Sequence, residues 1–126
     1  MSHQNLSRRE RQIMDVIYAR GEASVVEVAE GLADPPGVTA VRTMVTILEE
    51  KGHLTHTKRG REFIFQPTVP RKRAGRSAMR RVLQTFFDDS LESAVANHLS
   101  DPTARISDDE LKRLAALIRQ ARKKDR

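Results

Sequence analysis

The sequence predicts a mostly α-helical protein with one small β-hairpin, and three observations support this prediction. Apolar residues recur every three or four positions in six stretches, as they do on one face of a helix. The period changes at residues 53–66, where threonines and aromatic residues flank a glycine-containing turn, which is typical of a hairpin. Pro67 and Pro70 then mark a hinge, so we expect two domains, residues 1–70 and 71–126.

The first two helices are predicted by matching capping signals. Ser7 and Glu10 have the spacing of a capping box, in which a hydroxyl and a carboxylate satisfy the first free amides of a helix, and Gly21 is expected to end this helix. Ser24 and Glu27 repeat the pattern. An Asp-Pro-Pro-Gly sequence breaks the second helix, and a third helix follows at once. This order predicts a helix-turn-helix core.

The third predicted helix, residues 38–52, has two different faces. One face is apolar, and Gly52 is expected to end the helix in a left-handed conformation. The opposite face carries Thr39, which is also expected to cap the helix start, and Arg42, Thr43 and Thr46. Short hydroxyl side chains allow close approach to another surface, and an arginine can bind guanine through two hydrogen bonds. This face predicts DNA recognition; a solvated threonine-rich face is the alternative.

The hairpin is predicted from strands at residues 53–57 and 62–66. The turn between them carries three cations around a glycine, namely Lys58, Arg59 and Arg61. A helix-turn-helix followed by such a hairpin is a winged helix, in which the helix enters the major groove and the wing contacts the flanking backbone. These cations are therefore expected to neutralise phosphates. An ordinary solvated turn is the alternative.

The charge of the chain is uneven. The net charge is +6 and the isoelectric point is about 10.3, which favours nucleic acid or another anionic partner. Nine cationic and nine acidic residues cancel before Pro67, so the excess lies in the second half. Much of this excess is in Arg71, Lys72, Arg73, Arg76, Arg80 and Arg81. These residues either add contacts to the DNA backbone or form a solvated helix face. No apolar run approaches the ~18 residues of a membrane helix and no signal region begins the chain, so we expect a cytoplasmic protein.

The second half is predicted to contain three amphipathic helices. They lie near residues 73–87, 91–99 and 107–121, and the tail 122–126 is expected to fray. Such short helices bury their apolar faces poorly alone, so we expect a homodimer that presents two recognition helices to a palindromic DNA target. A monomer with these helices folded back onto the first domain is the alternative. The expected interface residues are Met79, Val82, Leu83, Phe86, Phe87, Leu91, Val95, Leu99, Leu111, Leu114, Leu117 and Ile118.

No catalytic constellation stands out in the sequence. The chain has no cysteine, and His53 and His56 are interpreted as wing or surface residues rather than metal ligands. The acidic pair Asp88–Asp89 and the run from Asp108 to Glu110 stand at expected helix starts, where capping explains them. We therefore expect no enzyme, no metal and no cofactor.

Several segments resemble the BlaI/MecI/CopY family of penicillinase and methicillin-resistance repressors. They are Leu6-Ser7 with Glu10 and Ile13-Met14, Val41-Arg42-Thr43 with Leu48 and Lys51-Gly52, Lys58-Arg59-Gly60-Arg61 with Phe65-Gln66-Pro67, and, in the helical half, Phe86-Phe87-Asp88 and Ser107-Asp108-Asp109-Glu110-Leu111. Their order spans nearly the whole chain. The resemblance implies a dimeric repressor of a palindromic operator, with the third helix and the wing contacting double-stranded DNA.

The resemblance leaves the inducing signal open. Copper-responsive members carry a C-terminal cysteine cluster, and this chain has no cysteine, so copper sensing by thiolates is excluded. The β-lactam-responsive members are cut by a membrane sensor protease, and the matching place is near Asn97, although a hydrophobic aromatic residue would be expected where His98 stands. Two alternative functions fit the same residues: a transcriptional activator, and a protein-interaction module on a winged-helix scaffold.

Overall fold

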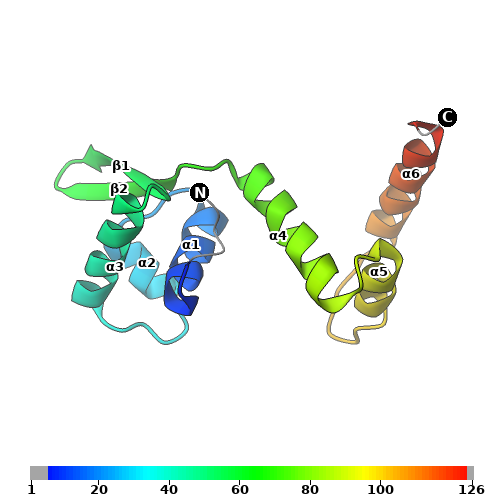
Figure 1. The fold of residues 1–126 in the computed structure, drawn as a ribbon, viewed down its shortest axis with the longest axis horizontal. Helices are drawn as coiled ribbons and strands as arrows, with labels where there is room; N and C mark the ends of the chain where they lie inside the picture. Colours follow the sequence, from blue (N-terminus) through cyan, green and yellow to red (C-terminus); the bar gives the residue numbers. More distant parts are fainter. Residues whose placement is uncertain (1–5, 125–126) are drawn as a thin grey trace. The chain divides into compact units, whose positions relative to one another are not determined.

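The computed structural model describes residues 6–124, and within them it contains six helices and one two-stranded antiparallel sheet (Figure 1). The predicted fold class, mostly helical with a small hairpin, is confirmed. The chain divides into two compact units between Ser77 and Ala78. The first unit holds three helices and the hairpin, α4 passes through the division, and the other two helices belong to the second unit.

The first two helices are α1 (Arg8–Arg20) and α2 (Val25–Gly31), and both begin at complete capping boxes. Ser7 Oγ accepts from the Glu10 amide at 3.1 Å, while Glu10 Oε1 accepts from the Ser7 amide at 2.9 Å. Ser24 and Glu27 form the same pair of bonds at 3.2 and 2.9 Å. Gly21, with φ +89°, ends α1 as predicted.

The third helix, α3 (Val38–Glu50), begins at the predicted residue but is capped by a different one. Gly37, at φ +101°, is the N-cap and no side chain caps the helix, so the predicted capping role of Thr39 is wrong. The reason is that Gly37 can adopt this backbone angle, which places Thr39 already inside the first turn. The predicted end is confirmed, because the Gly52 amide donates to the Glu49 carbonyl at 3.0 Å and the His53 amide to the Leu48 carbonyl at 2.9 Å, as in a Schellman motif.

The hairpin consists of β1 (Leu54–Arg59) and β2 (Glu62–Pro67). The first strand extends two residues closer to the tip than predicted, while the second begins at Glu62 as predicted, so that only Gly60 and Arg61 form the turn. Gly60 has φ +63° at the first central position, as a type II′ turn requires. At the base, Ala23 pairs with Phe65 through two backbone bonds of 2.8 and 3.0 Å, which ties the loop between α1 and α2 to β2.

The core of the first unit lies between α1, α2, α3 and the base of the hairpin. Its largest fully buried side chains are Ile13, Ile17, Val28, Val41, Val45 and Leu48. Burying each removes apolar surface from water and contributes about 1.5–3 kcal/mol relative to exposure. His53 is also buried, with 4% of its surface exposed, so its interpretation as a wing or surface residue is wrong. The Schellman turn carries the chain inward at this point.

The remaining helices are α4 (Arg71–Phe86), α5 (Leu91–Leu99) and α6 (Asp108–Lys124). Asp88 and Asp89 have φ of +52° and +61°, so they form the left-handed end of α4, and the predicted capping role of this pair is wrong. Ser90 is the cap of α5, and its hydroxyl accepts from the Ser93 amide at 3.1 Å. The predicted fraying is wrong for residues 122–124, which continue α6 as cations at its C-terminal end, where the helix dipole favours them; residues 125–126 lie outside the described chain.

Candidate nucleic-acid interface

The outward face of α3 gathers the four residues that the sequence assigned to DNA recognition. Thr39, Arg42, Thr43 and Thr46 are all exposed, while Val41, Val45 and Leu48 on the other side of the helix are buried. The side chain of Arg42 forms no hydrogen bond or ion pair with another residue of the described chain. Its guanidinium is therefore available to an external acceptor.

Two of these threonines are already engaged within α3. Thr43 Oγ1 donates to the Thr39 carbonyl at 3.2 Å, and Thr46 Oγ1 donates to the Arg42 carbonyl at 2.9 Å. A hydroxyl has one proton and two lone pairs, so these two side chains offer acceptors rather than donors to a partner. On this face, Arg42 supplies the donors.

The register of the hairpin separates the three wing cations. Residues opposite each other in the ladder share a face of the sheet, and successive residues alternate faces. Lys58 pairs with Phe63, whereas Arg59 pairs with Glu62, so Lys58 and Arg59 lie on opposite faces. Arg61 belongs to the turn. The sequence grouped these cations by their proximity along the chain, which does not reveal this separation.

A contact that the sequence did not predict joins the wing to α3. His56, on the same face as Lys58, places Nδ1 at 2.7 and 2.9 Å from the two carboxylate oxygens of Glu49 near the end of α3. The His56 ring also lies against the rings of Phe63 and Phe65, with centroids 4.5 and 5.6 Å away. This face of the wing is thus tied to α3.

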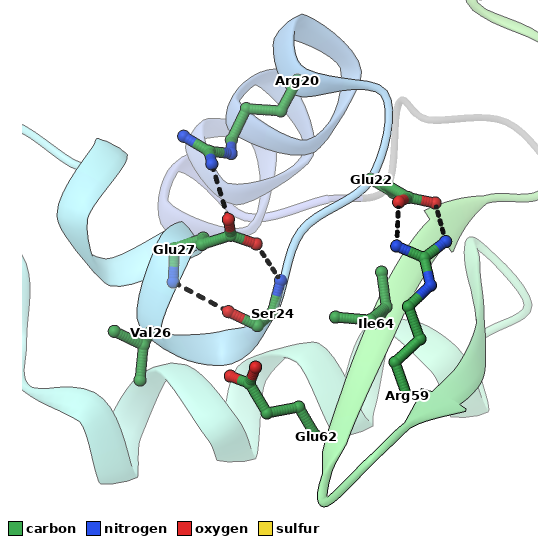
Figure 2. A pocket seen from close by; sticks show the side chains of 8 residues that line it. All are labelled: Arg20, Glu22, Ser24, Val26, Glu27, Arg59, Glu62 and Ile64. Atoms are coloured by element: carbon green, nitrogen blue, oxygen red, sulfur yellow. Dashed lines mark hydrogen bonds and ion pairs between the residues drawn. The ribbon is translucent and has the colours of Figure 1, made fainter.

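The opposite face of the wing contacts the loop between α1 and α2. Both terminal nitrogens of the Arg59 guanidinium donate to the carboxylate of Glu22, one of them at 2.9 Å (Figure 2). Arg59 holds the pKa of the Glu22 carboxyl below its ordinary value. In the same shallow hollow, Arg20 pairs with Glu27 at 2.7 Å. The two cations of this hollow are therefore each matched by a carboxylate.

A further ion pair holds the end of α3 in place. Lys51 Nζ lies 3.0 and 3.2 Å from the two carboxylate oxygens of Glu10, which is buried at the start of α1. The amide of Ser7 is the main cause that lowers the pKa of Glu10, and Lys51 adds to it. Glu10 thus serves the capping box and the α1–α3 contact together. The sequence predicted only the first of these roles.

Neither a metal site nor a membrane span emerges from the described residues. Across residues 6–124, no three histidine, aspartate or glutamate side chains converge as ligands for an ion. Among the helices of the same residues, none has both the length and the apolar character needed to cross a bilayer.

Three packed helices, a hairpin directly after the third, and an exposed Thr/Arg face on that helix define a winged helix-turn-helix protein, here followed by a helical unit. A family model described as penicillinase repressor matches residues 6–120, so the chain belongs to this family of transcriptional repressors. The family resemblance of the sequence is thereby confirmed.

Two individual relatives illustrate the similarity. The penicillinase repressor of Bacillus licheniformis is 26% identical over 117 residues, which cover 91% of this chain and 90% of that protein. A solved CopR repressor structure is 31% identical, covers 52% of this chain and 97% of its own, and superposes with a TM-score of 0.45. The roles of individual side chains at the interface stay predictions.

Proposed function

We propose that the protein is a sequence-specific DNA-binding repressor that acts as a homodimer on a palindromic operator. The observation that supports this most directly is the outward face of α3, where an available arginine stands among small hydroxyl side chains beside a cationic hairpin. Membership of a repressor family supports the direction of regulation.

The residues of the first unit have distinct roles in this proposal. Arg42 donates two hydrogen bonds to one base, most simply guanine, in the major groove. Thr39, Thr43 and Thr46 allow close approach, and the engaged hydroxyls of Thr43 and Thr46 accept from base amino groups. Lys58 and Arg61 neutralise phosphates beside the groove.

The helices of the second unit support the homodimer. No residue in the described part of α4, α5 or α6 is buried. Eight large apolar side chains predicted for the interface are exposed, from 39% for Val82 to 73% for Phe86. The other four, Leu83, Phe87, Val95 and Leu114, are half-buried. Monomeric proteins rarely expose so much apolar surface, so we assign these helices to an interface between two copies. Two-fold symmetry then implies two half-sites and a palindromic operator.

The cleavage position implied by the resemblance lies within a helix. Asn97 and His98 are exposed residues of α5. A protease acts on locally opened backbone, so cleavage here requires α5 to unwind first. The proposed function therefore does not include a sensor protease.

The experiment that tests the proposal is selection from a pool of random duplexes across a salt series. We expect a palindromic consensus whose affinity falls steeply with salt, because each neutralised phosphate contributes about 0.9 to the slope of log affinity against log salt. Retention without a consensus would show a non-specific binder. No retention at low salt would overturn DNA binding and favour a protein partner for α3.

A further inference from the structure

We propose that Arg59 positions the wing by binding Glu22, and that Lys58 and Arg61 alone supply its phosphate contacts. This inference rests on the proposed DNA-binding function and refines it, because the sequence assigned all three cations to phosphates. The basis is that Arg59 differs from the other two in its face, its partner and its place in the hairpin.

Lys58 and Arg59 lie on opposite faces of the wing, and each face has a different contact. Lys58 shares its face with His56, which is tied to Glu49 of the recognition helix α3. Arg59 is on the reverse face and binds Glu22, which lies in the loop before α2. Lys58 therefore shares the side that contacts the recognition helix, and Arg59 the side that contacts the loop between α1 and α2.

The base of the wing is buried, whereas its tip is exposed. The base of the hairpin is fixed by buried Leu54 and Phe65 and by the backbone pairing of Phe65 with Ala23. From Thr57 to Phe63 every residue is exposed. An isolated two-stranded hairpin is marginally stable, so the direction of such a tip needs a separate contact. Among the described residues, the pair between Arg59 and Glu22 is the ion pair nearest to the turn.

The pair between Arg59 and Glu22 is bidentate. Both carboxylate oxygens of Glu22 accept from the two terminal nitrogens of Arg59, and this planar bidentate geometry fixes direction as well as distance. An exposed pair contributes little to global stability, so orientation is the effect we expect from it. Because Glu22 balances its charge, Arg59 also adds little to the attraction of a phosphate.

The decisive experiment compares Glu22→Gln with Glu62→Gln in the full-length protein on the selected operator. Both variants remove one negative charge from the same region, but only the first breaks the pair with Arg59. If Arg59 positions the wing, Glu22→Gln weakens binding about threefold or more and makes the salt slope shallower by up to about two, because Lys58 and Arg61 lose their phosphates. Glu62→Gln is expected to bind as tightly as the wild type or slightly tighter. If Arg59 is itself a phosphate contact, Glu22→Gln frees it and binding becomes tighter, which would overturn the inference.

A charge exchange provides the second arm. Arg59→Glu alone is expected to weaken binding, and the double variant Glu22→Arg with Arg59→Glu is expected to recover most of the loss, since the pair re-forms with its ends exchanged. A phosphate contact at position 59 would not be recovered in this way. The preference among operator bases should stay unchanged throughout, because α3 is not altered.

Hydrogen exchange without DNA separates the failure of this inference from the failure of the proposed function. In Glu22→Gln, the amides from Thr57 to Phe63 should exchange faster, while those of the α1 and α3 core keep their protection. Unchanged exchange in the wing would overturn the positioning role. If the wild-type protein binds no DNA but the wing amides exchange faster in Glu22→Gln as expected, the positioning role of Arg59 is upheld and the proposed function fails.

Discussion

Arg42 is the only cation within the described helix α3, which makes it the side chain on which base recognition should depend. We expect Arg42→Ala to reduce the discrimination between the operator and a duplex altered at one base pair by about 1–3 kcal/mol. Fluorescence anisotropy with a set of single-base operator variants measures this. The folding stability should change by less than about 0.5 kcal/mol because the side chain is exposed.

Arg42→Lys is the matched control for the first prediction. It keeps the positive charge but loses the planar bidentate donor, so it should lose base preference while keeping the salt slope of the wild type. If either variant retains the full operator preference, another residue reads the bases.

Glu10 combines two roles that substitution can separate. Glu10→Gln can still accept from the Ser7 amide, since glutamine also serves in a capping box, but it loses the charge that faces Lys51. Glu10→Ala loses both interactions. We expect a loss in unfolding free energy of about 0.5–1 kcal/mol for the first variant and about 1–3 kcal/mol for the second. Urea unfolding measures both. Equal losses would show that the capping bond from the Ser7 amide contributes nothing, and no loss in Glu10→Gln would show that the charge facing Lys51 contributes nothing.

His53 predicts a pH dependence with a definite sign. Burial lowers the pKa of His53 from its ordinary value of 6.5, so the unfolded chain takes up a proton at a higher pH than the folded protein does. The stability should therefore fall as the pH drops below about 6.5. Glu10 adds a further loss only below its ordinary value of 4.5, because its pKa is lowered in the folded state and the loss comes on protonation.

Urea unfolding between about pH 7 and about pH 5 separates the histidines from the carboxylates, since this range lies above the ordinary carboxylate values. His53→Gln should flatten the dependence in this range. A variant that keeps the slope of the wild type would show that another group takes up the proton.

At the scale of elements, Gly52 and Gly75 predict opposite effects of the same substitution. Gly52 has φ +88° at the turn that leads from α3 into the wing, and a methyl group there would meet no atom within 4 Å, so the cost of Gly52→Ala is backbone strain of about 1–2 kcal/mol. Gly75 lies inside α4 with open space around it, so Gly75→Ala should stabilise that helix by about 0.5–1 kcal/mol. Thermal unfolding measures both variants, and the same sign for both would contradict this account.

The elements that the sequence predicted well are those with local signals. Capping boxes at Ser7 and Ser24 and the glycine after α3 specify boundaries within a few residues, and all three are confirmed. Thr39 failed as a cap because Gly37, whose backbone angle a sequence does not show, is the N-cap, so Thr39 lies inside the first turn. The pairs of His56 with Glu49 and of Arg59 with Glu22 join separate elements, so they follow from the tertiary arrangement and leave no pattern in the chain.

At the scale of the whole molecule, the two units differ in how far they bury their apolar residues. The first unit buries them in a shared core, whereas the second leaves Phe86, Leu91, Leu117 and Ile118 each more than half exposed. The sequence predicted helices of the second unit from periodicity alone. In a single chain the apolar side chains of these helices are exposed. This is a physical reason to expect a partner, because the hydrophobic effect favours covering such surface.

The last prediction tests that partner as a second copy of the chain. If the proposed dimer forms, its thermal midpoint should rise with protein concentration, since association stabilises the folded state by mass action. Phe86→Ser removes the most exposed large apolar side chain from this surface and should yield monomers in sedimentation. Val26→Ser, which changes an exposed apolar residue of α2 in the other unit, is the matched control and should stay dimeric.

The monomeric variant should bind a palindromic operator about a hundredfold more weakly, because the second half-site no longer benefits from linkage, while its affinity for an isolated half-site stays the same. Equal loss on both duplexes would instead mean that the substitution damages the winged helix, and concentration-independent unfolding of the wild type would contradict the dimer itself.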